Sequence, residues 1–347
     1  MAITFTNQVD EALGRILAEM RPSKVLVLAD ENTARVALPR VPSLLQATAI
    51  VIPAGDQHKT IDTTCRVWQE MENAGVTRHS LMVCLGGGMV TDLGGFAAST
   101  FKRGIPFVNV PTTLLAAVDA ATGGKTGVNF SGLKNEIGLF REACHVVIST
   151  CFFDTLPASE LLSGYAEMLK HAMLSSHDEF CRLLDVEPQS INWLEMLPQV
   201  EASVEVKRRI VASDPTEQGL RRVLNLGHTV GHALESLSQQ RGTPVTHGHA
   251  VACGLVTEAV LSHMVHKFPS TDLNRLATFV RHHYGPVRIT CNDYPALLQL
   301  MHSDKKSHCG EINCTLLRQC GDPTIDNTVT DDDMQAALDI YRDLLGI

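Results

Sequence analysis

The chain has 347 residues and a formal net charge of −9, with 44% hydrophobic and 5% aromatic residues. This length is long for one core and suits two domains that share a cleft, with cores built mainly of aliphatic side chains. A negative chain lacks the cationic face that nucleic acids and anionic membranes require, which argues against both as partners. An anionic substrate would have to be held by local lysines and arginines against the field of the whole chain.

The 10 cysteines are scattered without a CxxC pair, which is typical of reduced thiols in a cytosolic protein. The N-terminal segment does not combine a basic stretch with an apolar one, and no apolar run nears 18 residues. We therefore expect a soluble, cytoplasmic protein.

The first half of the chain alternates apolar runs with helical segments. Apolar runs at 24–30, 47–55, 80–88 and 106–113 predict buried strands, because parallel strands between helices are apolar on both faces. Residues 60–75 are amphipathic and begin at a threonine that suits a helix N-cap. This order predicts an α/β nucleotide-binding domain with a parallel sheet over residues 1–150.

After about Cys151 the apolar residues recur with the helical period of 3.6. This pattern predicts a mostly α-helical domain over residues 151–347, with one candidate hairpin at 310–322. The sequence shows neither a repeat nor a low-complexity linker, so we expect the two domains to pack closely. Helices are predicted at 158–176, 197–213, 229–240, 249–268 and 331–346.

A glycine run, Gly86 to Gly88, ends the third predicted strand and directly precedes a helix. Backbone amides there reach a pyrophosphate without hindrance, and the helix N-terminus adds partial positive charge. A bare glycine turn is the alternative, but the strand and helix on either side favour nucleotide binding. Asp30, at the end of the first predicted strand, suits a ribose diol or, equally, the cap of the next helix. Because the spacing is not GxGxxG, the motif alone does not identify the cofactor.

Two histidines, His228 and His232, are four residues apart in a segment expected to be helical. In a chain with 15 histidines such a pair often arises by chance, and packing is the commoner explanation. Glu167 and His247, from other helical segments, complete with His228 a set of one carboxylate and two imidazoles. This set suits a divalent ion, usually Zn²⁺, with open positions for substrate oxygens. Such an ion polarises a hydroxyl or carbonyl group.

Several cations stand among apolar or small residues, whereas an ordinary lysine or arginine is solvated. Together they suit a substrate that carries phosphate and carboxylate groups. These cations are Lys125, Lys134, Lys170, Lys207 and Arg221.

The chain resembles the 3-dehydroquinate synthases, which belong to the sugar phosphate cyclases. The resemblance is carried by GGGMVTDLGGFAASTFKRGIPFVNVPTTLLAAVDAATGGKTGVNFSGLKNEIG, SGYAEMLKHAML, LNLGHTVGHALE and HGHAVACGL. It implies an α/β domain for NAD, a helical domain for metal and substrate, and a homodimer. It also implies a carbon–oxygen lyase that converts 3-deoxy-D-arabino-heptulosonate 7-phosphate into 3-dehydroquinate and phosphate, in the shikimate pathway of aromatic amino acid biosynthesis. NAD and one divalent ion, Zn²⁺ foremost or Co²⁺, are the implied cofactors.

The resemblance also implies roles for individual residues, which fall into three sets. The nucleotide set, expected to contact NAD, is Asp30, Asp56, Lys59, Gly86, Gly87, Gly88, Asp92, Thr112, Thr113, Lys134 and Thr155. The metal set is Glu167, His228 and His247. The substrate set, expected in substrate binding or catalysis, is Asp119, Lys125, Asn135, Lys170, Lys207, Arg221, Asn225 and His232, with Arg103 reaching phosphate across the dimer and Lys305 or Lys306 from the segment DKK.

In this scheme His228 holds the metal ion and His232 faces the substrate as a proton-transfer partner. Two positions depart from the family pattern. His249 stands where glutamate is usual, two residues after His247, so it suggests an alternative ligand or altered surroundings of the ion. Asp56 replaces a glutamate and shortens the side chain by one methylene. Neither change removes a group that the chemistry requires.

Two other enzymes would use similar parts. Another sugar phosphate cyclase, such as 2-deoxy-scyllo-inosose synthase, would need the same NAD and metal, but its substrate lacks the carboxylate that Lys207 and Arg221 suit. A metal-dependent polyol dehydrogenase would instead produce net NADH. A binding protein without catalysis is disfavoured, because it would keep so many charged groups without use.

Overall fold

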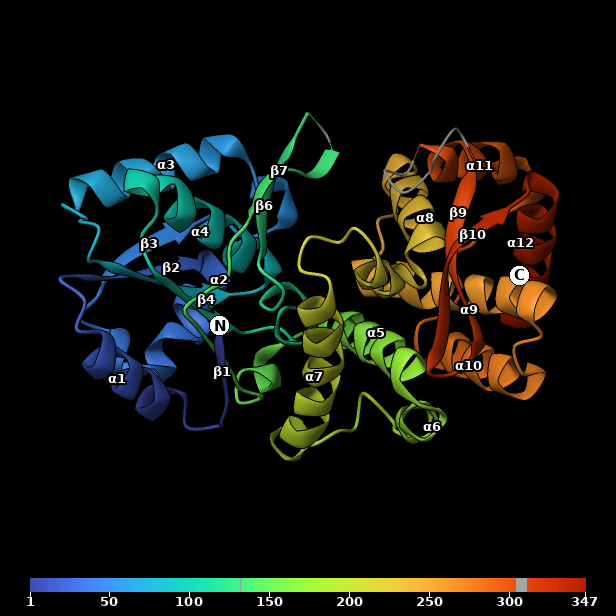
Figure 1. Ribbon diagram of the computed structural model, residues 1–347, viewed down its shortest axis with the longest axis horizontal. Coiled ribbons are helices and arrows are strands. Elements are labelled where there is room, and N and C mark those ends of the chain that lie inside the picture. The colour runs from blue at the N-terminus through green and yellow to red at the C-terminus, as the bar shows by residue number, and fades with distance from the viewer. Residues whose placement is uncertain (132, 304–310) are drawn as a thin grey trace. The chain divides into compact units, whose positions relative to one another are not determined.

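The computed structural model describes residues 1–131, 133–303 and 311–347 (Figure 1). The chain divides into two compact units. Unit 1 comprises Met1–Pro157 and Asn192–Arg208, and unit 2 comprises Ala158–Ile191 and Arg209–Ile347. Residues 192–208 therefore group with unit 1 although they follow a segment of unit 2 in the chain.

Unit 1 is built around a six-stranded sheet with the order β1-β8-β5-β4-β2-β3, in which all neighbouring strands are parallel. The four predicted strands are present, and the parallel α/β fold class is confirmed. β1 and β8 were not predicted. The strands are β1 (Ala2–Phe5), β2 (Val25–Asp30), β3 (Thr48–Ile52), β4 (Leu81–Gly86), β5 (Phe107–Pro111) and β8 (His145–Ile148).

The prediction that all four strands are buried is wrong for β3. Thr48, Ala49 and Val51 are exposed, whereas β4 and β5 are buried along their whole length. β3 stands at the edge of the sheet, next to β2 alone. An edge strand has neighbours on one side only, so apolar composition did not guarantee burial here.

Helices cover both faces of this sheet, with α1 and α3 on opposite sides (Figure 1), as in doubly wound α/β folds. α3 begins after Thr60, whose hydroxyl accepts a hydrogen bond from the Thr63 amide at 3.2 Å, so the predicted cap is confirmed. An unpredicted antiparallel hairpin, β6 (Lys125–Phe130) and β7 (Leu133–Phe140), packs on α4. The helices are α1 (Val9–Met20), α2 (Glu31–Val36), α3 (Ile61–Asn73) and α4 (Gly88–Thr100).

Unit 2 is mostly helical, as predicted, and α9 is its central helix because it packs against α5, α8, α10, α12 and β9. Among the residues that the structure describes, α9 is the one helix long and apolar enough to span a membrane, but 78% of its most apolar window is buried, as in a core helix. The helices are α5 (Ala158–Ser175), α6 (His177–Leu184), α8 (His228–Gln240), α9 (His247–His266), α10 (Ser270–His283), α11 (Tyr294–His302) and α12 (Asp331–Leu345). Helix α7 (Leu197–Ser213) contributes residues to both units.

A hairpin is present near the predicted position, but it extends further. β9 (Ile312–Gln319) and β10 (Asp322–Val329) pair antiparallel, so the range predicted for the hairpin ends at Asp322, the first residue of the second strand. Pro323 and an irregular register between Thr324 and Asn327 interrupt the alternation that identifies a strand in sequence.

Candidate active site

The glycine run lies at the carboxyl edge of the unit 1 sheet, where β4 ends and α4 begins. β2 pairs with β3 on one side and with β4 on the other, so the order of the strands changes direction at β2. Such a change of direction opens a crevice outside the carboxyl ends of β2 and β4, where α/β proteins bind ligands. Gly87 is the N-cap residue of α4 and has no side chain to cap the helix, so the first amides of α4 keep their affinity for an anion.

The surroundings of the glycines leave little room for side chains. A Cβ atom at Gly87 would lie 3.2 Å from Cγ2 of Thr113, and one at Gly88 would lie 3.3 Å from Cβ of Ala120. Beside them, at the end of β5, the hydroxyl of Thr112 is buried and has no hydrogen-bond partner among the described residues. Buried hydroxyls are normally hydrogen-bonded, so this atom fits a ligand that brings its own donor or acceptor.

Asp30 caps helix α2. Its Oδ1 accepts hydrogen bonds from the amides of Asn32 at 2.8 Å and Thr33 at 3.0 Å, and the Asp30 amide donates to the Thr33 hydroxyl at 3.0 Å. This is a complete capping box, one of the two roles that its position allowed. Contact with a ribose stays a prediction.

Four predicted residues of unit 1 meet in one polar network. The Lys59 ammonium donates to Oδ2 of Asp92 and to Oδ1 of Asn135, both at 2.5 Å. Asn129 links the rest: its side-chain amide donates to Oδ2 of Asp56 at 3.1 Å, and its Oδ1 accepts from the Asn135 backbone amide at 3.0 Å. Sequence reasoning assigned no role to Asn129, although its place beside the GGKTG segment was the available signal.

We expect Lys59→Met to destabilise the protein by roughly 2 to 3 kcal/mol, because it leaves the Asp92 carboxylate, whose side chain is only 18% exposed, without its ammonium partner. Burial raises the pKa of Asp92, and the Lys59 ammonium opposes this rise. Urea unfolding of the wild-type and variant proteins, each with and without NAD⁺, measures the loss. Lys24→Met is the control, because Lys24 is exposed. If Lys59→Met and Lys24→Met unfold alike, the Lys59–Asp92 pair contributes nothing to stability.

Asp119 and Lys207 form a second pair in unit 1. Asp119 lies in a short π-helix, Ala116–Ala120, a distortion that is frequent at functional sites. The buried Lys207 ammonium donates to the backbone oxygen and to Oδ1 of Asp119, both at 2.6 Å. Two members of the substrate set are therefore in direct contact.

Other members of the predicted sets lie at the surface. Lys125, Lys134 and Thr155 are exposed, as is Arg103, which has a left-handed backbone with φ of 67°. Their expected contacts with NAD, substrate or a second subunit stay predictions. Lys305 and Lys306 lie outside the described residues.

The metal set converges inside unit 2. Glu167, on α5, is fully buried, and its Oε1 lies 3.4 Å from Nε2 of His228 and 3.5 Å from Nε2 of His247. Two ligands that are each about 2.1 Å from a tetrahedral ion are roughly 3.4 Å apart. The separations of these atoms therefore match ligand atoms around one ion.

Each metal-set imidazole has a second partner behind it. Nδ1 of His228 lies 3.0 Å from the Leu226 carbonyl oxygen, and Nδ1 of His247 lies 3.4 Å from Oε2 of Glu235. A carbonyl oxygen only accepts, so the proton of neutral His228 is on Nδ1 and its Nε2 lone pair faces Glu167. Partners of this kind fix the orientation and tautomer of metal-binding histidines.

The charges of this cluster depend on one another. Burial and the Lys170 ammonium lower the pKa of His228 to about 3, so this imidazole is neutral. Burial lowers the pKa of His247, but Glu167 and Glu235 outweigh burial and raise it to about 9. Burial raises the pKa of Glu167, but the Lys170 ammonium, in ion-pair contact with Oε2, holds it well below its usual range. Glu167 is therefore an ionised carboxylate.

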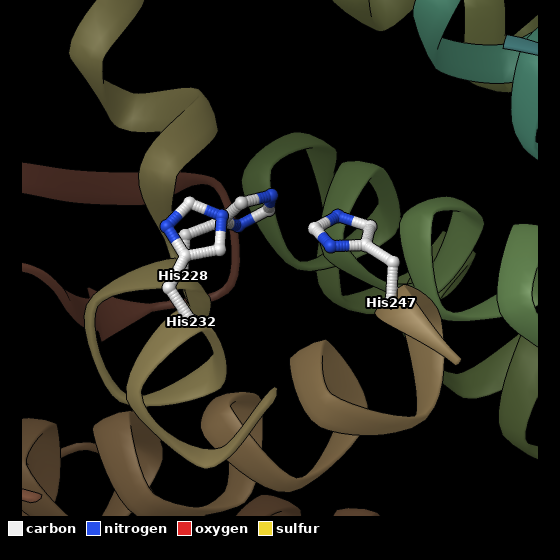
Figure 2. Close-up of side chains that lie close together, drawn as sticks. All are labelled: His228, His232 and His247. Carbon is white, nitrogen blue, oxygen red and sulfur yellow. The ribbon is translucent and has the colours of Figure 1, made fainter. Parts of the chain in front are cut away.

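His232 lies in the same cluster. Figure 2 shows His228 and His232 on α8 and His247 at the start of α9, with the three imidazoles facing one another. Each imidazole offers one nitrogen, and these three nitrogens lie within 4.8 Å of one another. The ring centroids of His232 and His247 are 5.8 Å apart. The arrangement accommodates His232 as a ligand or as a neighbour of the ion, so the assignment of His232 to proton transfer stays a prediction.

His249 is not part of this cluster. Its Nε2 lies 3.0 Å from the Gly285 carbonyl oxygen, and its ring lies 6.0 Å from that of Tyr284. Residues two apart on a helix point about 200° apart, so His249 and His247 leave α9 on opposite sides. The residue that departs from the family pattern therefore joins α9 to the end of α10 and does not act as an alternative ligand.

Arg221 and Asn225 belong to a short 3₁₀ segment, Leu220–Asn225, that precedes α8. Arg221 is only 2% exposed, and its Nη1 donates to the Pro215 carbonyl oxygen at 2.8 Å. Asn225 lines a small pocket beside Thr229.

Sequence reasoning missed Glu235 and Glu258, two of the buried carboxylates of unit 2. Glu235 contacts the metal-set His247, as described above. Glu258, on α9, accepts hydrogen bonds from the Gly227 amide at 2.6 Å and the Val230 amide at 3.2 Å, and so caps α8. The available signal for Glu258 was its position as the single charged residue in the apolar run between His249 and His263.

Comparison with known proteins identifies the relatives of the chain. Two family models match it: 3-dehydroquinate synthase N-terminal over residues 49–163, and 3-dehydroquinate synthase C-terminal over residues 164–307. A 3-dehydroquinate synthase from Parabacteroides distasonis is 43% identical over 348 residues, which cover 99% of each chain. A 3-dehydroquinate synthase from Pyrococcus abyssi is 42% identical over 309 residues, which cover 87% of this chain and 88% of the relative.

Solved structures of sugar phosphate cyclases share the fold. A 2-epi-5-epi-valiolone synthase from Streptomyces hygroscopicus, solved with NAD⁺ and Zn²⁺, has a TM-score of 0.84 and 26% identity, and covers 99% of this chain and 96% of that chain. A 2-deoxy-scyllo-inosose synthase, solved with carbaglucose-6-phosphate, NAD⁺ and Co²⁺, has a TM-score of 0.82 and 21% identity. The match covers 97% of this chain and 95% of that chain.

Proposed function

The chain belongs to the 3-dehydroquinate synthase family, and on this premise we propose that it converts 3-deoxy-D-arabino-heptulosonate 7-phosphate into 3-dehydroquinate and phosphate. The proposed reaction class is a carbon–oxygen lyase. The observation that carries the proposal is the convergence of Glu167, His228 and His247 on one point, in a chain 43% identical to a 3-dehydroquinate synthase over its whole length.

The metal set fits a divalent ion. Oε1 of Glu167 is buried and has no hydrogen-bond partner among the residues that the structure describes, and it faces the Nε2 lone pair of neutral His228. Two acceptors at this separation repel each other unless a cation lies between them. One carboxylate and two imidazoles suit Zn²⁺, and Co²⁺ accepts the same ligands.

The carboxyl edge of the unit 1 sheet fits NAD. The uncapped start of α4 suits the pyrophosphate, and the unpartnered hydroxyl of Thr112 suits a polar group of the nucleotide. We therefore propose that the domain predicted at 1–150 binds the nucleotide through the nucleotide set, and that the domain at 151–347 binds metal and substrate. When bound, NAD would supply a transient oxidation of a substrate hydroxyl and its later reversal, and the ion would polarise that oxygen.

The residues of the chain would hold the substrate and move its protons. We propose that Lys207 and Arg221 bind the substrate carboxylate. This carboxylate must compete with Asp119 for Lys207 and with the Pro215 carbonyl oxygen for Arg221. His232 would transfer a proton to or from the substrate. The other cations and Asn135 would stabilise the leaving phosphate. A substrate held in its folded conformation closes its ring without the entropy cost of an encounter.

We further propose that the protein is a cytoplasmic homodimer in which Arg103 reaches the phosphate of the neighbouring subunit. The exposed position of Arg103 is compatible with this role. The cysteines of the described residues are all free thiols, as expected in a reducing compartment.

Phosphate release tests the proposal. We expect release from 3-deoxy-D-arabino-heptulosonate 7-phosphate, none after treatment with a chelator, and no net change in absorbance at 340 nm, because the reduced nicotinamide is reoxidised in each turnover. Glucose 6-phosphate and sedoheptulose 7-phosphate lack the carboxylate and should release none. Preferential release from either of them would indicate another sugar phosphate cyclase, and net NADH production would indicate a polyol dehydrogenase.

A further inference from the structure

A second cluster of histidine and carboxylate side chains lies at the end of α10, at the surface of unit 2. It consists of Glu187, in the segment after α6, and His282 and His283, in the last turn of α10, and we call it the α10 triad. Each residue offers one ligand atom, and these atoms lie within 4.8 Å of one another. None of the three belongs to the sets proposed for NAD, metal or substrate.

The geometry of the α10 triad resembles that of the metal set. Nδ1 of His283 lies 3.3 Å from Oε1 of Glu187, close to the roughly 3.4 Å expected between two ligands of one tetrahedral ion. The rings of His282 and His283 are 4.6 Å apart and nearly perpendicular. From this juxtaposition we propose that the α10 triad binds a second divalent transition-metal ion, such as Zn²⁺, Ni²⁺ or Cu²⁺.

The supporting structure holds His283 in place and joins the segment of Glu187 to α10. The His283 side chain is only 6% exposed and packs on Phe279, with ring centroids 4.3 Å apart. The segment that carries Glu187 is joined to α10 by Arg275, which donates to Oδ1 of Asp185 at 2.8 Å. His282, by contrast, is exposed and free to adjust to an ion.

The electrostatics of this position also favour a cation. The carbonyl groups at the C-terminal end of a helix carry partial negative charge, which attracts cations.

The ligand types and the space define the class of ion. Two imidazoles and one carboxylate suit first-row transition metals, whereas Ca²⁺ and Mg²⁺ prefer oxygen ligands throughout. Two of the three side chains, His282 and His283, line an open hollow of about 410 Å³, so waters can reach their side of the triad. Because Glu187 and α10 lie on separate segments, an ion bound here would join them.

Zinc titration of the tag-free protein, already loaded with Zn²⁺ at its tighter site, tests the proposal. Equilibrium dialysis against increasing Zn²⁺, followed by elemental analysis, gives the zinc bound per chain. We expect His282→Asn to bind one equivalent less than the wild type. Glu187→Gln should weaken the same equivalent by about tenfold or more. Both side chains are exposed, so neither change should disturb folding.

His79→Asn is the matched control, because His79 is an exposed histidine of unit 1 and should leave zinc binding unchanged. The readout is the difference in zinc bound per chain between His282→Asn and the wild type. This difference does not depend on whether the metal set binds its own ion. Phosphate release at low zinc should be equal in all these variants. Equal zinc binding by His282→Asn and the wild type would overturn the proposal.

Discussion

Replacement of His228 by alanine should remove the metal ion and the enzymatic activity together. His228 supplies one of the two imidazole nitrogens that face Oε1 of Glu167, at 3.4 Å, and the Leu226 carbonyl oxygen fixes its orientation. Without it the ion would keep one carboxylate and one imidazole from the metal set. Loss of a residue that only supports a ligand costs about 10- to 100-fold in metal affinity, and loss of a ligand should cost more. Elemental analysis of the dialysed His228→Ala variant, with its phosphate release rate, measures both effects.

His232→Ala should behave differently, because we assign His232 to proton transfer. This variant should keep its metal ion and lose roughly 10²- to 10⁴-fold in kcat, the range typical of a lost general acid or base. His249→Gln is the control for a histidine of the same region, since its contact with the Gly285 carbonyl oxygen places it outside the cluster. We expect this control to keep its metal. Equal metal loss in His228→Ala and His232→Ala would put His232 among the ligands and contradict the assignment.

The fold was predictable where burial and periodicity coincide. The four strands predicted from apolar runs and all five helices predicted from the 3.6-residue period in the second half are present. β1 and β8 escaped prediction because each is only four residues long and is defined by its pairing with a distant segment. The β6–β7 hairpin escaped for another reason: β7 is exposed along most of its length, so no apolar pattern marks it.

The site was predictable to the extent that its residues occur in recognisable motifs. Glu167, His228 and His247 were chosen from the sequence, and the structure brings them together. The residues that hold them were not found, because an outer partner is defined by contact in space. Glu235 is seven residues from His228 on the same helix, yet it supports His247 of the next helix. No spacing rule in a single sequence expresses that relation.

Glu258 is the outer residue with the largest expected effect on stability. Its carboxylate is fully buried and accepts hydrogen bonds from the amides of Gly227 and Val230, at the start of the helix that carries His228 and His232. Gly227 has no side chain with which to cap that helix, and its φ of 78° is the left-handed conformation that glycine tolerates. A glutamate from α9 therefore provides the cap that α8 cannot supply for itself.

Glu258→Ala should lower the free energy of unfolding by roughly 3 kcal/mol, because it leaves two buried amides without acceptors and removes a helix cap. It should also weaken metal binding by about tenfold, since His228 is the first residue of the helix whose start is released. Glu258→Gln keeps one acceptor oxygen but turns an NH₂ group toward the other amide, so its effects should be intermediate. Urea unfolding of the metal-free variants and zinc titration of the folded variants measure the two effects separately.

Thr257→Val is the matched control for Glu258→Ala. Thr257 is equally buried on α9, but within the described part of the chain its hydroxyl donates only to the Cys253 carbonyl oxygen of the same helix, at 3.1 Å. Its loss should cost less than about 1 kcal/mol and should leave zinc affinity unchanged. If Glu258→Ala unfolds more easily than Thr257→Val yet binds zinc as tightly as the wild type, the cap stabilises α8 without positioning His228. Weaker zinc binding in Glu258→Ala alone would show that the start of α8 is held in place for the metal ligand.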